Sequence, residues 1–231
     1  MSHLPLGALA ILGAGLAAFS APPASAADPE RNGPSFDCTR AASEAERAIC
    51  ASKPLSSLDG QIGMRYAALR RGLDTSSAEK LKKDQQWFIA RRDSAFGDAQ
   101  ARIPILKDRL TFLNAIDWSP PAGIEGVWSN LAGEIIVSRG PDGSLVFSAN
   151  AVEPTNARWV CEESGKLATT SVSGWNTLGG DPEARLSFAR SGATLEVSEP
   201  AGVPNPNCGL NGSLAGSYFH TAASAPVART K

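Results

Sequence analysis

The chain has 231 residues, of which 42% are hydrophobic and 19% are charged, and its formal net charge at pH 7 is −1. This composition is typical of a chain that folds around a hydrophobic core. The sequence has no basic aromatic strand motif, so we do not expect a nucleic-acid-binding protein. Residues 61–110 carry eleven basic and six acidic side chains, whereas residues 111–231 carry seven and eleven. The simplest interpretation is a solvated helical surface beside a mildly acidic β domain. The alternative is that the acidic part attracts a basic partner.

Residues 1–27 have the pattern of an export signal. The apolar stretch of residues 4–19 is followed by a small-x-small pattern in residues 21–27, which predicts cleavage after Ala26 or Ala27. An uncleaved membrane anchor is the alternative, but the stretch is short and is interrupted by Gly and Pro. No later apolar run could cross a bilayer, so we expect a periplasmic or secreted chain without stable membrane insertion. Residues 28–34 are expected to form a mobile leader.

The predicted mature chain contains four cysteines, Cys38, Cys50, Cys161 and Cys208. An even number in an exported protein favours disulfides, and three pairings are possible. Pairing within each local segment, Cys38 with Cys50 and Cys161 with Cys208, is the simplest. A zinc site is the competing interpretation, but the sequence has no C-x-x-C motif and His220 is the only histidine left after cleavage. We therefore expect neither a metal nor a cofactor.

Residues 35–116 show helical periodicity and predict two or three antiparallel helices. Thr39 is a candidate cap for a first helix over residues 40–51, and Ser56 or Ser57 for a second. A third helix is predicted over about residues 77–116, with a kink or break caused by Gly97 and Pro104.

A Pro- and Gly-rich linker at residues 117–123 marks a change from helical to two-residue periodicity. About eight short strands then predict a small antiparallel β-barrel or sandwich over residues 124–220. The expected pairs are residues 134–138 with 144–148, residues 158–161 with 168–172, and residues 185–190 with 193–197, before a closing strand over 212–220. Residues 221–231 are expected to be a disordered tail. The predicted fold class is α+β.

The sequence contains no recognisable catalytic constellation. It has no Gly-x-Ser-x-Gly elbow, and His220 lies near the end of the chain, where fraying is expected. The adjacent carboxylates of Glu162 and Glu163 would point to opposite faces of a strand, which does not suit glycoside cleavage. We therefore do not expect an enzyme.

The predicted helical part contains the following set of marks: Phe36, Asp37, Cys38, Ile49, Cys50, Leu58, Asp59, Tyr66, Gln86, Trp87, Arg91, Arg92 and Asp93. With these marks, about residues 35–116 resemble the N-terminal domain family of the lysozyme inhibitor LprI, found in exported bacterial proteins. The sequence departs from the family where a second cysteine pair is usual, because Ala95 and Phe96 stand there. The C-terminal part resembles β domains that accompany this helical domain, but it lacks the Ser-Gly-x-x-Tyr mark of small β-barrel lysozyme inhibitors.

The resemblance implies a protein that binds and blocks lysozyme or another cell-wall hydrolase. The alternative is a non-inhibitory envelope binding or scaffold module that recognises a glycan, such as peptidoglycan, or another exported protein. Glu162, Glu183 and Trp175 are the candidate binding residues, although core packing is the commoner role for a barrel tryptophan. Trp87 and Arg91 lie one helical turn apart, which favours a stacked seam between helices over a binding role.

Overall fold

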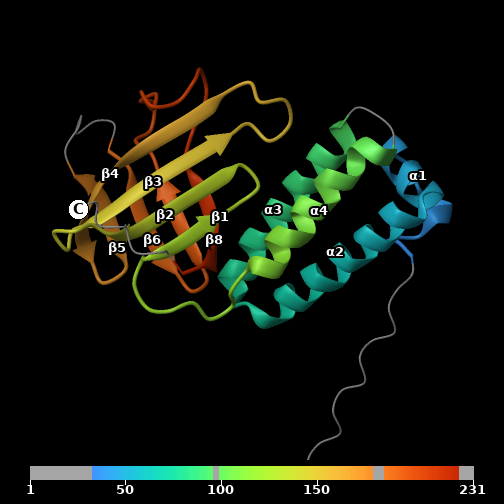
Figure 1. Cartoon of the computed structure of the whole chain (residues 1–231), viewed down its shortest axis with the longest axis horizontal. Coiled ribbons are helices and arrows are strands. Elements are labelled where there is room, and N and C mark those ends of the chain that lie inside the picture. The colour runs from blue at the N-terminus through green and yellow to red at the C-terminus, as the bar shows by residue number, and fades with distance from the viewer. Residues whose placement is uncertain (1–32, 96–98, 179–184, 224–231) are drawn as a thin grey trace, which may run out of the picture. The chain divides into compact units, whose positions relative to one another are not determined.

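The computed structural model describes residues 33–95, 99–178 and 185–223 (Figure 1). The predicted export signal, Gly97, Glu183 and most of the predicted tail lie outside these ranges. None of the described helices is both long enough and apolar enough to cross a membrane.

The N-terminal part is helical. A short 3-10 helix, η1 (Cys38–Arg40), precedes α1 (Glu44–Ala51), α2 (Lys53–Gly72), α3 (Thr75–Ser94) and α4 (Ala99–Ala115). The predicted third helix is interrupted between α3 and α4, on either side of Gly97, whereas Pro104 lies inside α4. The disulfide between Cys38 and Cys50 joins η1 to α1, as local pairing predicted.

The caps of the first two helices differ from the prediction. Ser43, not Thr39, caps α1, because its side chain accepts from the Glu46 backbone while the Glu46 carboxylate accepts from the Ser43 backbone. The α2 helix begins at Lys53, before Ser56 and Ser57, with Pro54 in its first turn. Proline is tolerated there because the first helical N–H groups have no partner within the helix.

The C-terminal part is a closed antiparallel barrel in which each strand pairs with its neighbours in sequence and β1 pairs with β8. Its strands are β1 (Gly126–Ser129), β2 (Gly133–Arg139), β3 (Leu145–Val152), β4 (Val160–Ser171), β5 (Gly174–Leu178), β6 (Ser187–Ser191), β7 (Thr194–Ser198) and β8 (Gly216–Ala222). The two strands expected over residues 158–161 and 168–172 are one long strand, β4. It continues because its first eight residues pair with β3, and the pairing with β5 begins at Lys166, before the β3 pairing ends.

The barrel core is built from aromatic and aliphatic side chains. Trp128, Phe188 and Tyr218 are at most 1% exposed. The two polar atoms that they carry inward are satisfied locally: Trp128 Nε1 donates to the Ile124 carbonyl at 2.8 Å, and the Tyr218 hydroxyl donates to the Leu214 carbonyl at 2.9 Å. The second disulfide, between Cys161 and Cys208, ties β4 to the long connection before β8.

Helices and barrel share buried side chains. Phe219 of β8 is fully buried with the helical core, where its ring meets the edge of the Phe112 ring at 6.1 Å between centroids. Lys80 of α3 lies 2.8 Å from a carboxylate oxygen of Glu196 on β7. The predicted linker at residues 117–123 is held as well, since the Arg190 guanidinium donates to the carbonyl oxygens of Pro120, Pro121 and Gly123.

His220 is buried rather than frayed. Its ring is 3% exposed and meets the Trp128 ring at 5.1 Å between centroids. A Cβ atom on Gly126, whose φ is +148°, would lie 2.5 Å from His220 Nε2, so the ring occupies space that only glycine leaves free. Burial lowers the pKa of His220 below 6.5, and the nearby Asp117 carboxylate only partly opposes this.

This burial predicts acid sensitivity. The unfolded chain binds a proton at His220 more readily than the folded protein does, so folding stability is complete above pH 6.5 and falls as the pH drops toward the lowered pKa. We expect the free energy of unfolding in urea to fall between pH 7.5 and 5.5, by at most about 1.4 kcal/mol per pH unit. His220→Phe, which keeps an aromatic ring against Trp128, should flatten this dependence. An equal slope in both proteins would contradict the assignment.

Candidate functional site

One buried ion pair organises the N-terminal end of the helical part. Arg92 of α3 contacts Asp59 of α2 at 3.3 Å, and both are at most 5% exposed. The other Asp59 oxygen accepts from the Ser35 backbone at 2.8 Å and from its hydroxyl at 2.6 Å, while Arg92 also contacts Asp93 at 2.7 Å. Two of the residues that carry the family resemblance, Asp59 and Arg92, therefore lie in an internal network, and a third, the exposed Asp93, joins it from the surface.

Phe36, Leu58 and Tyr66, which also carry the resemblance, are partly buried against the same helical core. Asp37 caps η1, because its carboxylate accepts from the Thr39 backbone at 2.9 Å, and this bond lowers the Asp37 pKa. These residues therefore stabilise the fold. The residues of the family motif that remain accessible for binding lie on α3.

A second ion pair connects α3, α4 and the barrel. Arg109 of α4 contacts the carboxylate of Asp84 and donates to Gln85 Oε1 at 3.1 and 2.7 Å. Its guanidinium also stacks over Phe88 and Phe112, at 5.1 and 5.0 Å from the ring centroids. The remaining Asp84 oxygen accepts from the Leu131 backbone at 3.1 Å, in the turn between β1 and β2. Asp84 therefore fixes this turn against α3.

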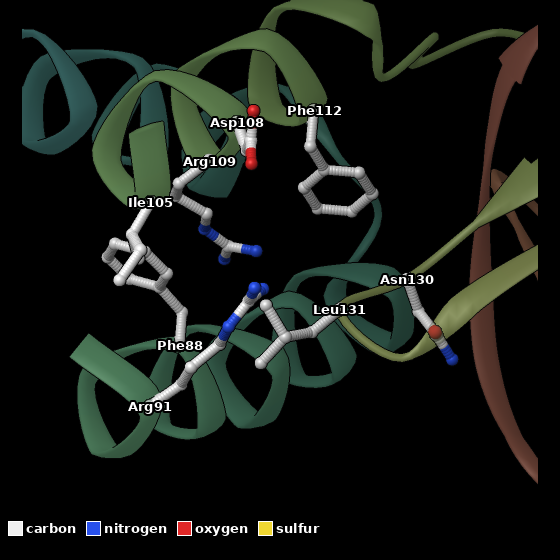
Figure 2. Close-up of a pocket in the computed structure, with 8 residues that line it drawn as sticks. All are labelled: Phe88, Arg91, Ile105, Asp108, Arg109, Phe112, Asn130 and Leu131. Carbon is white, nitrogen blue, oxygen red and sulfur yellow. The ribbon is translucent and has the colours of Figure 1, made fainter. Parts of the chain in front are cut away.

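The fixed turn closes one side of a hollow of about 110 Å³ between α3, α4 and the barrel. Figure 2 shows Arg91 and Arg109 reaching toward one another from α3 and α4, with Leu131 beside them. Its lining residues are Phe88, Arg91, Ile105, Asp108, Arg109, Phe112, Asn130 and Leu131. Arg109 is committed to Asp84 and Gln85, whereas the Arg91 guanidinium has no hydrogen-bond or ion-pair partner among the described residues.

Two further hollows adjoin the first. One, of about 350 Å³, shares Asn130 with it and is lined by Lys80, Lys83, Asp84, Gln86, Trp87, Asn130, Gly216 and Ser217. The other, of about 240 Å³, shares Arg91 and Leu131 with it and includes Val152 and residues 153–157. Together the three hollows follow α3 along its boundary with the barrel, and we call them the α3 groove.

Three side chains of α3 form a row along this groove. Lys83, Trp87 and Arg91 are four residues apart, so they lie on one face of the helix. Trp87 is 61% exposed and makes no ring contact with Arg91 in the described structure, so the predicted stacked seam is not formed. Gln86 is exposed beside it. The part of the family motif that does not serve the core is thus gathered on one surface.

The predicted barrel residues lie in different environments. Glu162 is exposed on β4, two residues from Val160, which is 61% exposed and pairs with the 39% exposed Val152 of β3. Trp175 is only 5% exposed and belongs to the barrel core, which leaves no ring face for a ligand, so we do not propose it as a contact. Glu183 lies outside the described residues.

The described residues contain no group of three or more His, Cys, Asp or Glu side chains placed to hold a metal ion. All four cysteines are in disulfides. Glu163, the neighbour of Glu162, accepts from the Asn205 side chain at 3.1 Å, so the two carboxylates do not form a pair in one cleft.

Residues 38–110 match the family model described as lysozyme inhibitor LprI. The matched segment is about a third of the chain. This confirms the resemblance for the helical part, including α3 up to and beyond Arg91. A search of curated proteins and a search of solved structures found no match.

The Asp84–Arg109 pair predicts a large stability effect. Asp84→Asn leaves the Arg109 charge buried without a counter-ion, and we expect the free energy of unfolding to fall by about 3 kcal/mol or more. Glu79→Gln, which breaks the exposed ion pair with Arg70, should cost less than about 1 kcal/mol. Urea unfolding at constant pH measures both, and equal losses would show that Asp84 has no special role.

Proposed function

We propose, from the match of the helical part to the lysozyme-inhibitor family, that this protein binds a lysozyme-like cell-wall hydrolase and blocks its cleft. Blocking requires only a complementary surface and no bond-making chemistry. The two disulfides support a location outside the cytoplasm, where such a hydrolase acts. We further propose that residues 1–27 direct export to the periplasm or the medium.

The outer face of β3 and β4 is the surface that we propose for the enzyme. It combines the exposed carboxylate of Glu162 with the exposed aliphatic side chain of Val160 on the same strand. An apolar side chain beside a charged group helps to exclude water from the charge when a partner binds. A carboxylate in this setting suits a basic enzyme, and the acidic balance of residues 111–231 would speed its association.

The main support for this proposal is the match of residues 38–110 to the lysozyme-inhibitor family, not the character of the barrel surface. Fold and activity separate easily in evolution, so the non-inhibitory envelope module remains the second candidate. The two differ in one observable: an inhibitor forms a complex with the enzyme itself, whereas an envelope module binds a wall component or another protein without slowing the enzyme.

The inhibitor proposal predicts slower clearance of a bacterial cell-wall suspension. Oxidised protein at near-stoichiometric ratio should slow clearance by at least one of several lysozymes, more strongly at low than at moderate salt. Unchanged clearance at large excess would rule out inhibition of the enzymes tested.

A charge reversal locates the contact. Glu162→Lys should weaken inhibition about tenfold, which corresponds to about 1.4 kcal/mol of binding free energy. Glu79→Lys makes the same change in net charge on α3 and is the matched control. Equal weakening by both variants would show that overall charge, and not the β3–β4 face, determines binding.

A further inference from the structure

We infer that the α3 groove is a separate binding site for a carboxylate-bearing oligosaccharide, with a sugar ring on Trp87 and carboxylates paired with Lys83 and Arg91. This inference goes beyond enzyme blocking, because the ligand is a glycan and the residues that would hold it, Lys83, Trp87 and Arg91, lie on α3. It depends on the geometry of the groove and not on the proposed hydrolase complex.

Trp87 provides the platform. A side chain this large and apolar is normally covered, yet it is 61% exposed and lines the largest of the three hollows. The face of an indole ring is electron-rich, and the C–H bonds on one face of a pyranose ring present weakly positive hydrogens to it. The ring edge and its hydroxyl groups then remain free to meet polar side chains.

The polar groups around Trp87 fall into a fixed set and a free set. Asn130 is fixed, because its side-chain oxygen accepts from the backbones of Ala132 and Gly133 at 2.8 and 2.9 Å. Lys80 is likewise held by Glu196 and Thr194. By contrast, the Gln86 amide has no hydrogen-bond partner among the described residues and can both donate to and accept from sugar hydroxyls. The fixed groups shape the wall and the free groups remain for a ligand.

The free cations indicate that the ligand is acidic. Neither Lys83 nor Arg91 has an ion-pair partner in the described parts of the chain. They are eight residues apart on α3, about 12 Å along the helix axis, with Trp87 midway. That separation exceeds a single sugar ring, which favours an oligosaccharide over a monosaccharide.

The acidic residues of the groove do not cancel these charges. Asp84 is paired with Arg109. The Glu153 carboxylate accepts from the backbones of Thr155 and Asn156 at 3.1 and 2.6 Å and forms no ion pair with Arg91 among the described residues. Asp108 lines the middle hollow, but it forms no ion pair with Arg91 or Arg109 among the described residues.

An acidic peptide is the competing ligand, and the barrel argues against it. One common mode of peptide binding adds a strand to a free sheet edge, but every barrel strand is paired on both sides. A peptide in the groove could therefore not bind by strand addition. A basic hydrolase is also disfavoured here, since Lys83 and Arg91 would repel it.

Two tetrasaccharides with the same rings test the inference by titration calorimetry on the oxidised full chain, without any hydrolase. One alternates N-acetylglucosamine and N-acetylmuramic acid, which carries a carboxylate, and the other is the uncharged N-acetylglucosamine tetramer. We expect the acidic ligand to bind at least tenfold more tightly at low salt, with the preference falling as salt is added. Trp87→Ala should weaken both at least tenfold, whereas Ile89→Ala, at another exposed apolar position on α3, should not.

The charge preference is tested separately. The double variant Lys83→Gln and Arg91→Gln should reduce the preference for the acidic ligand to about twofold or less while leaving the neutral tetramer unchanged. Arg71→Gln with Lys82→Gln removes the same charge from other exposed positions and should keep the preference.

Three results would overturn the inference: no binding of either saccharide, binding that survives Trp87→Ala, or tighter binding of an oligoglutamate that the same variants abolish. Direct binding of each variant to lysozyme distinguishes failure of the saccharide site from failure of the hydrolase proposal. Trp87→Ala should bind the enzyme as the unmodified protein does, while Glu162→Lys should bind the acidic saccharide normally.

Discussion

The groove depends on the contacts of one buried carboxylate, that of Asp84. One oxygen pairs with Arg109 of α4, and the other accepts from the Leu131 backbone in the β1–β2 turn. A buried carboxylate is costly unless both oxygens are satisfied, so helix α4 and the barrel turn are held to α3 by the same requirement. Phe219, buried in the helical core, adds apolar contact to this polar one. The groove forms where these elements meet and leave α3 partly uncovered.

The residues that carry the family resemblance have two physical roles. Asp59 and Arg92 face inward and pair across α2 and α3, where exposure is at most 5%. Gln86, Trp87 and Arg91 face the groove and remain accessible. Helical geometry explains how adjacent residues divide in this way, because Arg91 and Arg92 are separated by about 100° around the helix axis. One short motif can therefore both fix the fold and present a surface.

The two proposed surfaces have opposite charge character. The groove presents the unpaired cations Lys83 and Arg91, whereas the β3–β4 face presents Glu162 beside the exposed Val160. A protein of this kind could hold a wall glycan and a basic hydrolase at different surfaces, since each would be attracted by one surface and repelled by the other. The interface between helices and barrel matters for this arrangement, because part of the groove wall comes from barrel residues such as Asn130 and Ser217.

The sequence by itself determined the local features: helices before a barrel or sandwich and the hairpin of β6 and β7, because these depend on periodicity and on nearby residues. It also favoured the two disulfide pairings that form, without excluding the others. It misplaced the caps of α1 and α2, proposed Pro104 as a second helix-breaking position although this residue lies within α4, and divided β4 in two. Only the tertiary structure decided that Trp87 is exposed, that Trp175 and His220 are buried, and that Asp84 reaches Leu131. Exposure and long-range pairing depend on which surfaces meet across distant parts of the chain, and spacing along the sequence does not encode this directly.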